Sequence, residues 1–387
     1  MDGPIGSISY LEKSNNQACL MKVEYWHKDF QWNGISFSST SEIIDFADQN
    51  FPELHTFIRE WFGEKGRITM ITSGSTGTPK TIGLYREHMV NSSKATASYF
   101  SLSNGSRVLL CLPLGYIAGR MMLVRSMVMG WQLDVINPSA SLDIPQNVLY
   151  DFSAMVPLQL ANSIDQLENI QTLIVGGGQI SDDLSKKTEH LKTKVYATYG
   201  MTETITHVAL SPENRAAGKK DEEKIFTALA GIHFSTDKRG CLIISAPSIS
   251  SSEVVTNDIV KLISDRSFIW LGRYDHVINS GGLKLLPELI EAKYRNLINT
   301  DYFVYGLPDE VLGQKLVLFV EGEERSNLYK EIIDFQQRHS DDVSKYEIPK
   351  RVMFAKNFIR TETGKVNRKK TVARLLTSGK DLNLLNG

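Results

Sequence analysis

The residues from Thr72 to Lys80 are the part of this sequence best suited to chemistry. They read TSGSTGTPK, in which hydroxyl side chains alternate with two glycines and a lysine closes the run. Glycines let the backbone turn its N–H groups toward an anion, hydroxyls add hydrogen-bond donors, and the lysine adds positive charge. The loop predicts a polyphosphate site, although a solvated turn has the same composition. Its spacing is not the GxxxxGK[ST] of P-loop NTPases.

Other short segments carry charged or ring-bearing groups beside turn residues. The run YGMTET holds Tyr199 and Glu203, TND holds Asp258, and TGKVNR holds Lys365. Taken singly, each has an ordinary alternative: a solvated glutamate, a structural aspartate in a turn, or a surface lysine. The run Gly176–Gly178 after an apolar segment is likewise typical of a plain strand–turn–helix junction.

Taken together and in order, five segments resemble motifs of the adenylate-forming superfamily, which includes acyl-CoA synthetases, luciferases and peptide-synthetase adenylation domains. They are Thr72–Lys80 for the phosphate loop, Tyr199–Thr204 for YGxTE, Asp258 for the aspartate of TGD, Leu271–Glu291 for GRxDDxIxxxGxxIxPxEIE, and Thr361–Arg368 for the GKxxR lysine motif. They span residues 71 to 368, and five ordered matches outweigh the ordinary alternative for each one alone.

The resemblance implies that the chain binds ATP and Mg²⁺. The phosphate loop would hold the β- and γ-phosphates, and Glu203 would hold Mg²⁺, which prefers hard oxygen ligands. The three glycines and Tyr199 would enclose the adenine, while Asp258 and Arg273 would hold the ribose. The residues assigned to the nucleotide in this way are Thr72, Ser73, Gly74, Ser75, Thr76, Gly77, Lys80, Gly176, Gly177, Gly178, Tyr199, Gly200, Thr202, Asp258 and Arg273.

The same resemblance implies two half-reactions, formation of an acyl-adenylate and transfer of the acyl group to coenzyme A. Lys365, with Glu203 and Thr72, is expected to be catalytic, because a lysine is a compact charge that can contact both the carboxylate and the α-phosphate in the transition state. Asp275 would be the hinge about which a C-terminal domain rotates, although it could equally be a surface carboxylate. The rotation would place Gly281, Gly282 and Lys284 along the pantetheine channel.

The acid is expected to bind near the segment CLPLGYIAGRMM, residues 111–122. Tyr116 stands where superfamily members commonly carry a gating aromatic residue or histidine, and Thr204 and His207 follow the magnesium glutamate. Arg120 is an unusual charge in an apolar helix-like run, so it is either an exposed helix position or a partner for a second carboxylate on the acid.

The short segments PLGYIAGRMM and YGMTETITH resemble bacterial o-succinylbenzoate–CoA ligases of menaquinone biosynthesis. Their substrate is a dicarboxylate with an aryl ketone, which an arginine in the pocket would suit. Two alternatives are a stand-alone adenylation enzyme that loads a carrier-protein thiol, and a catalytically silent nucleotide-binding scaffold. The retained Glu203, Asp258, Arg273, Asp275 and Lys365 argue against the scaffold.

Length and composition are those of an ordinary globular protein. The 387 residues suggest roughly two or three domains, with 42% hydrophobic residues, 22% charged residues and a formal charge of -1. The sequence therefore predicts a small-molecule carboxylic acid as partner, with no nucleic acid and no membrane insertion. Cys19, Cys111 and Cys241 have no metal-binding spacing, and the start of the chain does not resemble a signal peptide, so we expect a cytoplasmic protein. The oligomeric state is left open.

Alternation of apolar strand-like runs with helix-like segments predicts an α/β fold. We expect a large N-terminal domain with mixed or parallel sheets over residues 1–272, short for the superfamily. A small α+β C-terminal domain would span residues 275–387, with the hinge at 273–275. Residues 1–67 are expected to be an irregular cap with one helix near 41–49. Strands are predicted at 68–72, 107–112, 132–136, 172–175, 194–198, 301–306 and 314–320, and helices at 86–100, 118–129, 157–163, 182–191, 287–298, 328–339 and 369–376.

Overall fold

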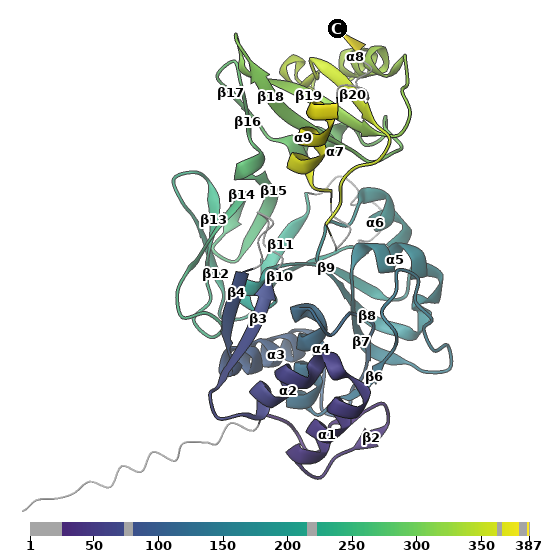
Figure 1. Cartoon of the computed structure of the whole chain (residues 1–387), viewed down its shortest axis with the longest axis vertical. Helices are drawn as coiled ribbons and strands as arrows, with labels where there is room; N and C mark the ends of the chain where they lie inside the picture. Colours follow the sequence, from purple (N-terminus) through teal and green to yellow (C-terminus); the bar gives the residue numbers. More distant parts are fainter. Residues whose placement is uncertain (1–24, 73–79, 215–222, 362–365, 379–384, 387) are drawn as a thin grey trace, which may run out of the picture.

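A computed structural model describes residues 25–72, 80–214, 223–361, 366–378 and 385–386 (Figure 1). The predictions for Ser73, Gly74, Ser75, Thr76, Gly77 and Lys365 lie outside the described residues.

Six adjacent strands of a 13-stranded sheet are parallel, and five of them form the centre of the fold. These five, in spatial order, are β6 (Gln132–Val135), β5 (Arg107–Leu110), β7 (Tyr150–Met155), β8 (Ile170–Val175) and β9 (Lys194–Gly200). Most of their residues are buried, as expected for parallel strands covered on both faces. The chain therefore forms the parallel sheet that the alternating pattern predicted.

Antiparallel strands extend this sheet on one side and make it mixed. They follow β9 in the order β10 (His207–Pro212), β11 (Ile225–Ala228), β15 (Ser267–Arg273), β14 (Val254–Ser264), β13 (Cys241–Ser245) and β12 (His233–Thr236). The opposite edge is formed by β1 (Gln31–Trp32) and β2 (Ile35–Ser36), while β3 (Arg67–Thr72) and β4 (Lys80–Tyr85) pair as a separate hairpin. The predicted fold class is confirmed.

Helices cover both faces of the parallel strands. The crossover from β5 to β6 runs along the sheet in the opposite direction to those from β7 to β8 and from β8 to β9, and right-handed crossovers then place their helices on opposite faces. Figure 1 shows α3 and α4 on one side of these strands and α5 and α6 on the other. Their bounds are α3 (Arg86–Phe100), α4 (Ile117–Met129), α5 (Pro157–Ser163) and α6 (Asp182–Thr188).

The expectation of an irregular cap before residue 67 was incomplete. The predicted helix is present as α1 (Thr40–Asn50), but a second helix, α2 (His55–Phe62), follows it. Its Phe57, Ile58 and Trp61 are buried, which anchors it to the core. In the described part of the chain, none of the helices has the length and apolar character needed to cross a membrane.

A second sheet begins after residue 277. It has the order β17 (Leu283–Leu285), β16 (Ile278–Ser280), β19 (Gly313–Glu321), β20 (Arg351–Ala355) and β21 (Leu385–Asn386), with β18 (Tyr302–Asp309) also paired to β19. The accompanying helices are α7 (Pro287–Tyr294), α8 (Leu328–Arg338) and α9 (Arg368–Ser378). This sheet lies at the upper end of the molecule in Figure 1.

The two sheets have separate hydrophobic cores. One cluster of buried side chains runs from Phe30 to Phe268, and the others contain only residues from Ile278 onward. Between the sheets the chain passes through a short 3-10 turn, η4 (Tyr274–His276). The expected rotation of one part against the other about Asp275 stays a prediction.

Replacement of Phe319 by alanine should destabilise the second sheet. Phe319 is fully buried on β19 and stacks on Phe303 at 5.1 Å between ring centroids. Removing a buried phenylalanine costs about 3–5 kcal/mol of unfolding free energy. Urea denaturation should show this loss. Val311→Ala, at a side chain that is 89% exposed, should change the unfolding midpoint little. Equal effects of the two substitutions would contradict this description of the core.

Candidate functional site

The predicted nucleotide residues gather at the carboxyl ends of the parallel strands. Gly176–Gly178 follow β8, and Tyr199 and Gly200 end β9, the strand at which the sheet changes from parallel to antiparallel. Ligands of open α/β sheets characteristically bind beside the carboxyl ends of strands. The residues expected to bind adenine thus lie at the carboxyl ends of the strands, where ligands of such sheets usually bind.

Asp258 links the end of β9 to strand β14. The Tyr199 hydroxyl donates a 2.6 Å hydrogen bond to Asp258 Oδ2, and the Trp270 indole Nε1 donates to Oδ1 at 3.1 Å. Burial, together with the neighbouring Asp258 carboxylate, raises the pKa of Tyr199 well above its usual value. Tyr199 therefore stays a neutral donor, and the carboxylate is held in a fixed orientation.

Arg273 connects this carboxylate to the turn between the sheets. It lies opposite Asp258 across β14 and β15, with Nη1 3.6 Å from Asp258 Oδ1, and its Nε donates to Asp275 Oδ1 at 2.9 Å. Burial alone would raise the pKa of Asp275, but the hydrogen bonds and charge of Arg273 outweigh it and the pKa is lowered. The expected ribose contacts and the expected hinge residue are thus joined through one guanidinium group.

Close packing leaves no room for a Cβ at two of the predicted glycines. A Cβ at Gly176 would lie 2.4 Å from Thr198 Oγ1, and one at Gly200 would lie 2.3 Å from the carbonyl oxygen of Thr206. Gly177 has a φ of +78°, which favours glycine. Gly178 has ordinary space around it. The close approach of β9 to its neighbours therefore explains Gly176 and Gly200 before any nucleotide contact is considered.

The turn after β9 presents Glu203 to solvent. It is the 3-10 turn η3 (Thr202–Thr204), and it ends at Ile205, a non-glycine residue with φ +66°. Glu203 is exposed, whereas Thr204 is fully buried and its hydroxyl hydrogen-bonds to Met201 and to the Thr206 carbonyl oxygen at 2.8 Å. Thr204 shapes the turn, and its expected contact with substrate stays a prediction.

The exposed carboxylate of Glu203 fits a magnesium ion carried by phosphates. No group of three or more histidine, cysteine or acidic residues in the described part of the chain could hold a metal. Mg²⁺ is usually bound by one or two carboxylates together with waters and substrate phosphates. A single outward-facing glutamate beside the nucleotide residues matches that mode.

A buried arginine on α4 was not among the assigned site residues. Arg125 is 1% exposed, its Nη2 donates to Thr206 Oγ1 at 3.1 Å, and its buried Nε has no hydrogen-bond partner within the described structure. No carboxylate pairs with it among the described residues. The signal in the sequence was the apolar run MMLVRSMVM, in which an arginine must either reach water or meet a buried anion.

His207 lies beside Arg125. His207 Nδ1 is 3.4 Å from Thr206 Oγ1, the atom that accepts from Arg125, and its Nε2 is 3.3 Å from Thr96 Oγ1. Burial and then the Arg125 charge lower the pKa of His207 well below its usual value. Arg125 is therefore the cation of this pair, and neutral His207 supplies hydrogen-bonding nitrogens.

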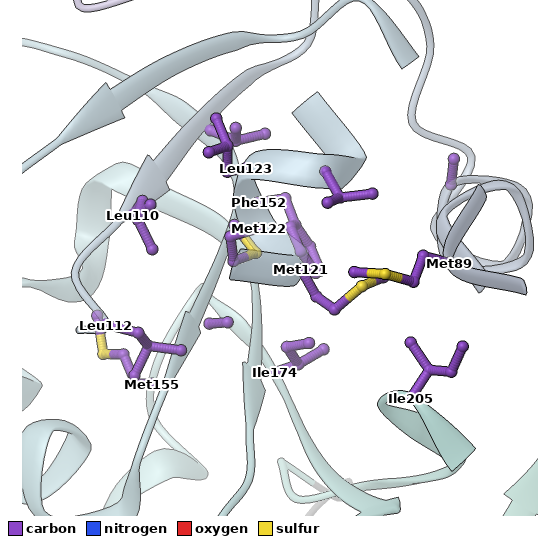
Figure 2. Packing of buried hydrophobic residues seen from close by; sticks show 14 of the residues in the cluster. Met89, Leu110, Leu112, Met121, Met122, Leu123, Phe152, Met155, Ile174 and Ile205 are labelled. Atoms are coloured by element: carbon purple, nitrogen blue, oxygen red, sulfur yellow. The ribbon is translucent and has the colours of Figure 1, made fainter. Parts of the chain in front are cut away.

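The surroundings of α4 are rich in methionine. Figure 2 shows Met121 of α4 and Met89 of α3 pointing toward one another, with Ile205 nearby. Methionine side chains are flexible and adapt to irregular shapes. Arg125 Nη1 lies 3.7 Å from Met122 Sδ, so this apolar and adaptable environment adjoins the buried charge.

Arg120 has partners within the fold. Its Nε donates to the Leu114 carbonyl oxygen at 2.9 Å, its Nη1 lies 2.9 Å from Met70 Sδ, and its guanidinium stacks 5.0 Å from the ring of Phe57. These contacts hold α4 against α2 and β3. The expected role of Arg120 as a carboxylate partner stays a prediction, as does the gating role of Tyr116, which is 43% exposed at the start of α4.

The expected coenzyme A residues lie on the hairpin of β16 and β17. Gly281 and Gly282 have φ values of +57° and +83°, which suit a tight turn, and Lys284 is exposed. In Figure 1 this hairpin lies at the far end of the molecule from β9 and its neighbours. The structure thus brings together the expected nucleotide residues of the large sheet and keeps the hairpin away from them.

Comparisons with known proteins agree on one family. Residues 64–228 match the family model described as AMP-binding enzyme. A solved structure of an acyl-CoA synthetase (AMP-forming)/AMP-acid ligase II-like protein from Dyadobacter fermentans is 38% identical, covering 84% of this chain and 94% of that one, with a TM-score of 0.54.

Two further matches carry a more specific name. The 2-succinylbenzoate–CoA ligase of Listeria monocytogenes is 24% identical over 88% of this chain and 75% of that relative. The o-succinylbenzoate CoA synthetase of Bacillus subtilis, solved with its acyl-adenylate intermediate, is 19% identical over 86% of this chain and 80% of that one, with a TM-score of 0.66. At that identity the structural match shows a shared fold.

Fold, strand-end site and comparisons together define an enzyme of the adenylate-forming class. The chain belongs to the AMP-binding enzyme family, within which it is an AMP-forming acyl-CoA synthetase.

Substitution of Gly200 by alanine should damage the site more than the fold elsewhere. The added Cβ would lie 2.3 Å from the Thr206 carbonyl oxygen and would push apart β9 and the segment that carries Glu203 and Thr206. We expect at least a tenfold loss of kcat in ATP–pyrophosphate exchange. Val311→Ala, at a side chain that is 89% exposed, is the control and should retain activity. Wild-type activity in the Gly200 variant would contradict the assigned geometry.

Proposed function

We propose that this enzyme activates 2-succinylbenzoate with ATP and Mg²⁺ and transfers the acyl group to coenzyme A, as a cytoplasmic step of menaquinone biosynthesis. The names of the relatives described above support this substrate, and so does one feature of the chain itself. That feature is the buried charge of Arg125.

A buried cation without a counterion is unfavourable unless a ligand supplies one. Removing a charge from water costs several kcal/mol, and no carboxylate among the described residues offsets this cost for Arg125. Burial lowers the pKa of Arg125 to about 9, so the group still carries its charge at neutral pH. A substrate with a second carboxylate would neutralise it, and the planar guanidinium can bind that carboxylate through two hydrogen bonds.

Arg125 fits this role better than Arg120. The Arg120 guanidinium contacts a carbonyl oxygen, a thioether and an aromatic ring. Arg125 contacts the Met122 thioether and the Thr206 hydroxyl, but its buried Nε has no partner within the described structure. Thr206 and His207 beside Arg125 belong to the segment that follows Glu203. The distal carboxylate would therefore bind within reach of the nucleotide residues, and the methionines of α3 and α4 would surround the aryl group.

The first half-reaction needs charge neutralisation and alignment. The acid carboxylate attacks the α-phosphate of ATP, and pyrophosphate leaves. Tyr199, Asp258 and Arg273 would position the nucleoside, while Glu203 would hold the Mg²⁺ that neutralises phosphate charge. Thr72 and Lys80 flank the phosphate loop, and Lys365 would contact both the carboxylate oxygen and the α-phosphate in the transition state.

The orientation of the second sheet suits this first half-reaction. Figure 1 shows α9 on the side of the second sheet that faces the large sheet, with the hairpin of β16 and β17 at the far end. Arg295, the residue after α7, pairs with Asp182 of α6 at 2.5 Å across the junction, beside a cavity of about 620 Å³. Rotation about Asp275 would then bring Gly281, Gly282 and Lys284 to the adenylate for attack by the coenzyme A thiol.

A carrier-protein thiol is the alternative acceptor. An adenylation enzyme of that kind would share the first half-reaction, so only the acceptor distinguishes the two. The wild-type enzyme, incubated with a panel of acids, ATP, Mg²⁺ and coenzyme A, should release AMP and form a thioester with 2-succinylbenzoate. Acid-dependent pyrophosphate exchange without a coenzyme A thioester would support the carrier-loading enzyme instead.

Replacement of Arg125 by methionine should separate function from stability. Exchanging an unpaired buried cation for an apolar side chain of similar length is expected to leave the melting temperature unchanged or raised. The KM for 2-succinylbenzoate should rise at least 100-fold, while a mono-acid analogue without the distal carboxylate should lose little and ATP affinity should stay within about threefold. Arg120→Met is the matched control. Equal losses for both acids, or a larger loss in the Arg120 variant, would contradict the assignment of Arg125 to the distal carboxylate.

Lys365→Ala should abolish adenylation and largely spare thioester formation from supplied acyl-adenylate. The lysine charge is needed where the first transition state accumulates negative charge. The two half-reactions can be followed separately, by pyrophosphate exchange and by thioester release. An equal loss of rate in both half-reactions would contradict a role for Lys365 that is confined to adenylation.

A further inference from the structure

Helix α9 begins with an unusual concentration of positive charge. Its first three residues are Arg368, Lys369 and Lys370. Cations at the N-terminal end of a helix are unfavourable, because that end already carries partial positive charge from the helix dipole. Negatively charged groups must therefore compensate for the positive charge at this helix end.

Two carboxylates of α7 enclose the Arg368 guanidinium. Its Nη1 lies 2.8 Å from Glu291 Oε1, its Nη2 donates to Glu291 Oε2 at 2.8 Å, and Nη2 is 3.5 Å from Glu288 Oε1. The side chains are only 18%, 16% and 10% exposed for Arg368, Glu291 and Glu288. Lys369 and Lys370, by contrast, are exposed. Arg368 is therefore the cation of this helix end that is fixed by close ion pairs.

Glu288 also reaches the turn between the two sheets. His276 Nδ1, in η4, lies 2.5 Å from Glu288 Oε1. A Cβ at Gly272 would lie 2.6 Å from Glu288 Oε2, so glycine is needed for this approach. Burial would raise the pKa of Glu288, but His276 and Arg368 outweigh it and the pKa is lowered. An ionised Glu288 thus bridges the expected hinge and the start of α9.

Glu291 fixes the same helix start to the second sheet. Its Oε1 accepts a 2.8 Å hydrogen bond from the Val304 backbone N–H of β18, in addition to its contacts with Arg368. The Arg368 guanidinium also lies 5.8 Å from the ring of Phe303. Strand β18, helix α7 and the first residue of α9 are therefore joined through one pair of side chains.

Arg368, together with the Glu291 and Glu288 carboxylates that hold it, forms an anchor at the start of α9. The sequence places this anchor next to the expected catalytic lysine. Lys365 precedes Arg368 by three residues. Three residues of fully extended chain span at most about 11 Å. Whatever fixes Arg368 therefore limits the region that the Lys365 amine can occupy, and removal of the anchor enlarges that region.

We propose that Arg368 is a positioning residue for Lys365, held by Glu291 and Glu288 and linked through Glu288 to His276 of the hinge turn. This inference rests on the role of Lys365 in the proposed function. It assigns a task to the arginine of the lysine motif and to Glu291 of the long motif, residues 77 positions apart that meet in α7 and α9.

The test compares neutral replacements of Arg368 and Glu291 with a neutral replacement of Lys369, an exposed residue at the same helix end. Arg368→Gln and Glu291→Gln should each lower kcat for ATP–pyrophosphate exchange by about 10-fold to 100-fold, with KM for ATP and for the acid within about threefold. Thioester formation from supplied acyl-adenylate should stay within about twofold. Arg368→Lys should recover part of the exchange rate, since it keeps the charge. Lys369→Gln, which removes a charge but no ion pair among the described residues, should have wild-type rates in both half-reactions.

Glu291→Gln keeps an acceptor for the Val304 N–H, so it tests the anchor even if Arg368→Gln does not fold. Equal losses in both half-reactions, or losses in Lys369→Gln as large as those at Arg368, would overturn the inference. Wild-type exchange in Arg368→Gln, alongside lost exchange in Lys365→Ala, would overturn it while leaving the proposed function intact. Retained exchange in Lys365→Ala would instead remove the lysine role itself, and the inference with it.

Discussion

The carboxylate of Asp258 is the interaction on which the arrangement of the site depends. It accepts hydrogen bonds from Tyr199 at the end of β9 and from Trp270 on β15, and it faces Arg273 across the β14–β15 pair. A buried carboxylate is stable only when donors surround it. Because these donors come from β9 and β15 and the carboxylate itself from β14, the requirement fixes the end of the parallel sheet relative to the antiparallel strands. Arg273 extends the same constraint to Asp275 and so to the junction with the second sheet.

A second constraint follows from charge that the protein alone does not neutralise. Arg125 is buried on a largely apolar helix beside a histidine whose pKa is lowered, and the described residues supply no counterion. Functional sites commonly carry such uncompensated groups, because the ligand completes the interaction. The proposed substrate would do so with its distal carboxylate while its other carboxylate reacts. Affinity and selectivity for a dicarboxylate would then come from the same atoms that destabilise the enzyme without substrate.

The regular elements could be predicted from the sequence to a large extent. Helix α3 and helix α5 have the bounds expected from their apolar pattern, and β5, β6, β8 and β9 were expected close to where they lie. Strand β7 and helix α2 were missed, and the short helix α7 ends four residues earlier than expected. These failures involve segments whose burial depends on partners distant in the chain, which local periodicity does not record.

The residues of the site, like the helices and strands, could be predicted from the sequence only in part. Motif order placed Tyr199, Gly200, Glu203, Asp258 and Arg273 in one region, and the structure brings their elements together at the strand ends. The choice between Arg120 and Arg125 could not be made from the sequence, since both lie in one apolar helix. The two arginines differ in the residues that they contact: Arg120 contacts Met70, Phe57 and Leu114, and Arg125 contacts Thr206. These contacts are determined by the tertiary fold.

A crystal structure of the enzyme with a non-hydrolysable analogue of the acyl-adenylate of 2-succinylbenzoate would test the central claim most directly. The account predicts that the distal carboxylate lies about 3 Å from the Arg125 guanidinium nitrogens, at hydrogen-bonding distance, with the ribose hydroxyls on Asp258. A distal carboxylate bound at Arg120 or exposed to solvent, with Arg125 still unpaired, would contradict it.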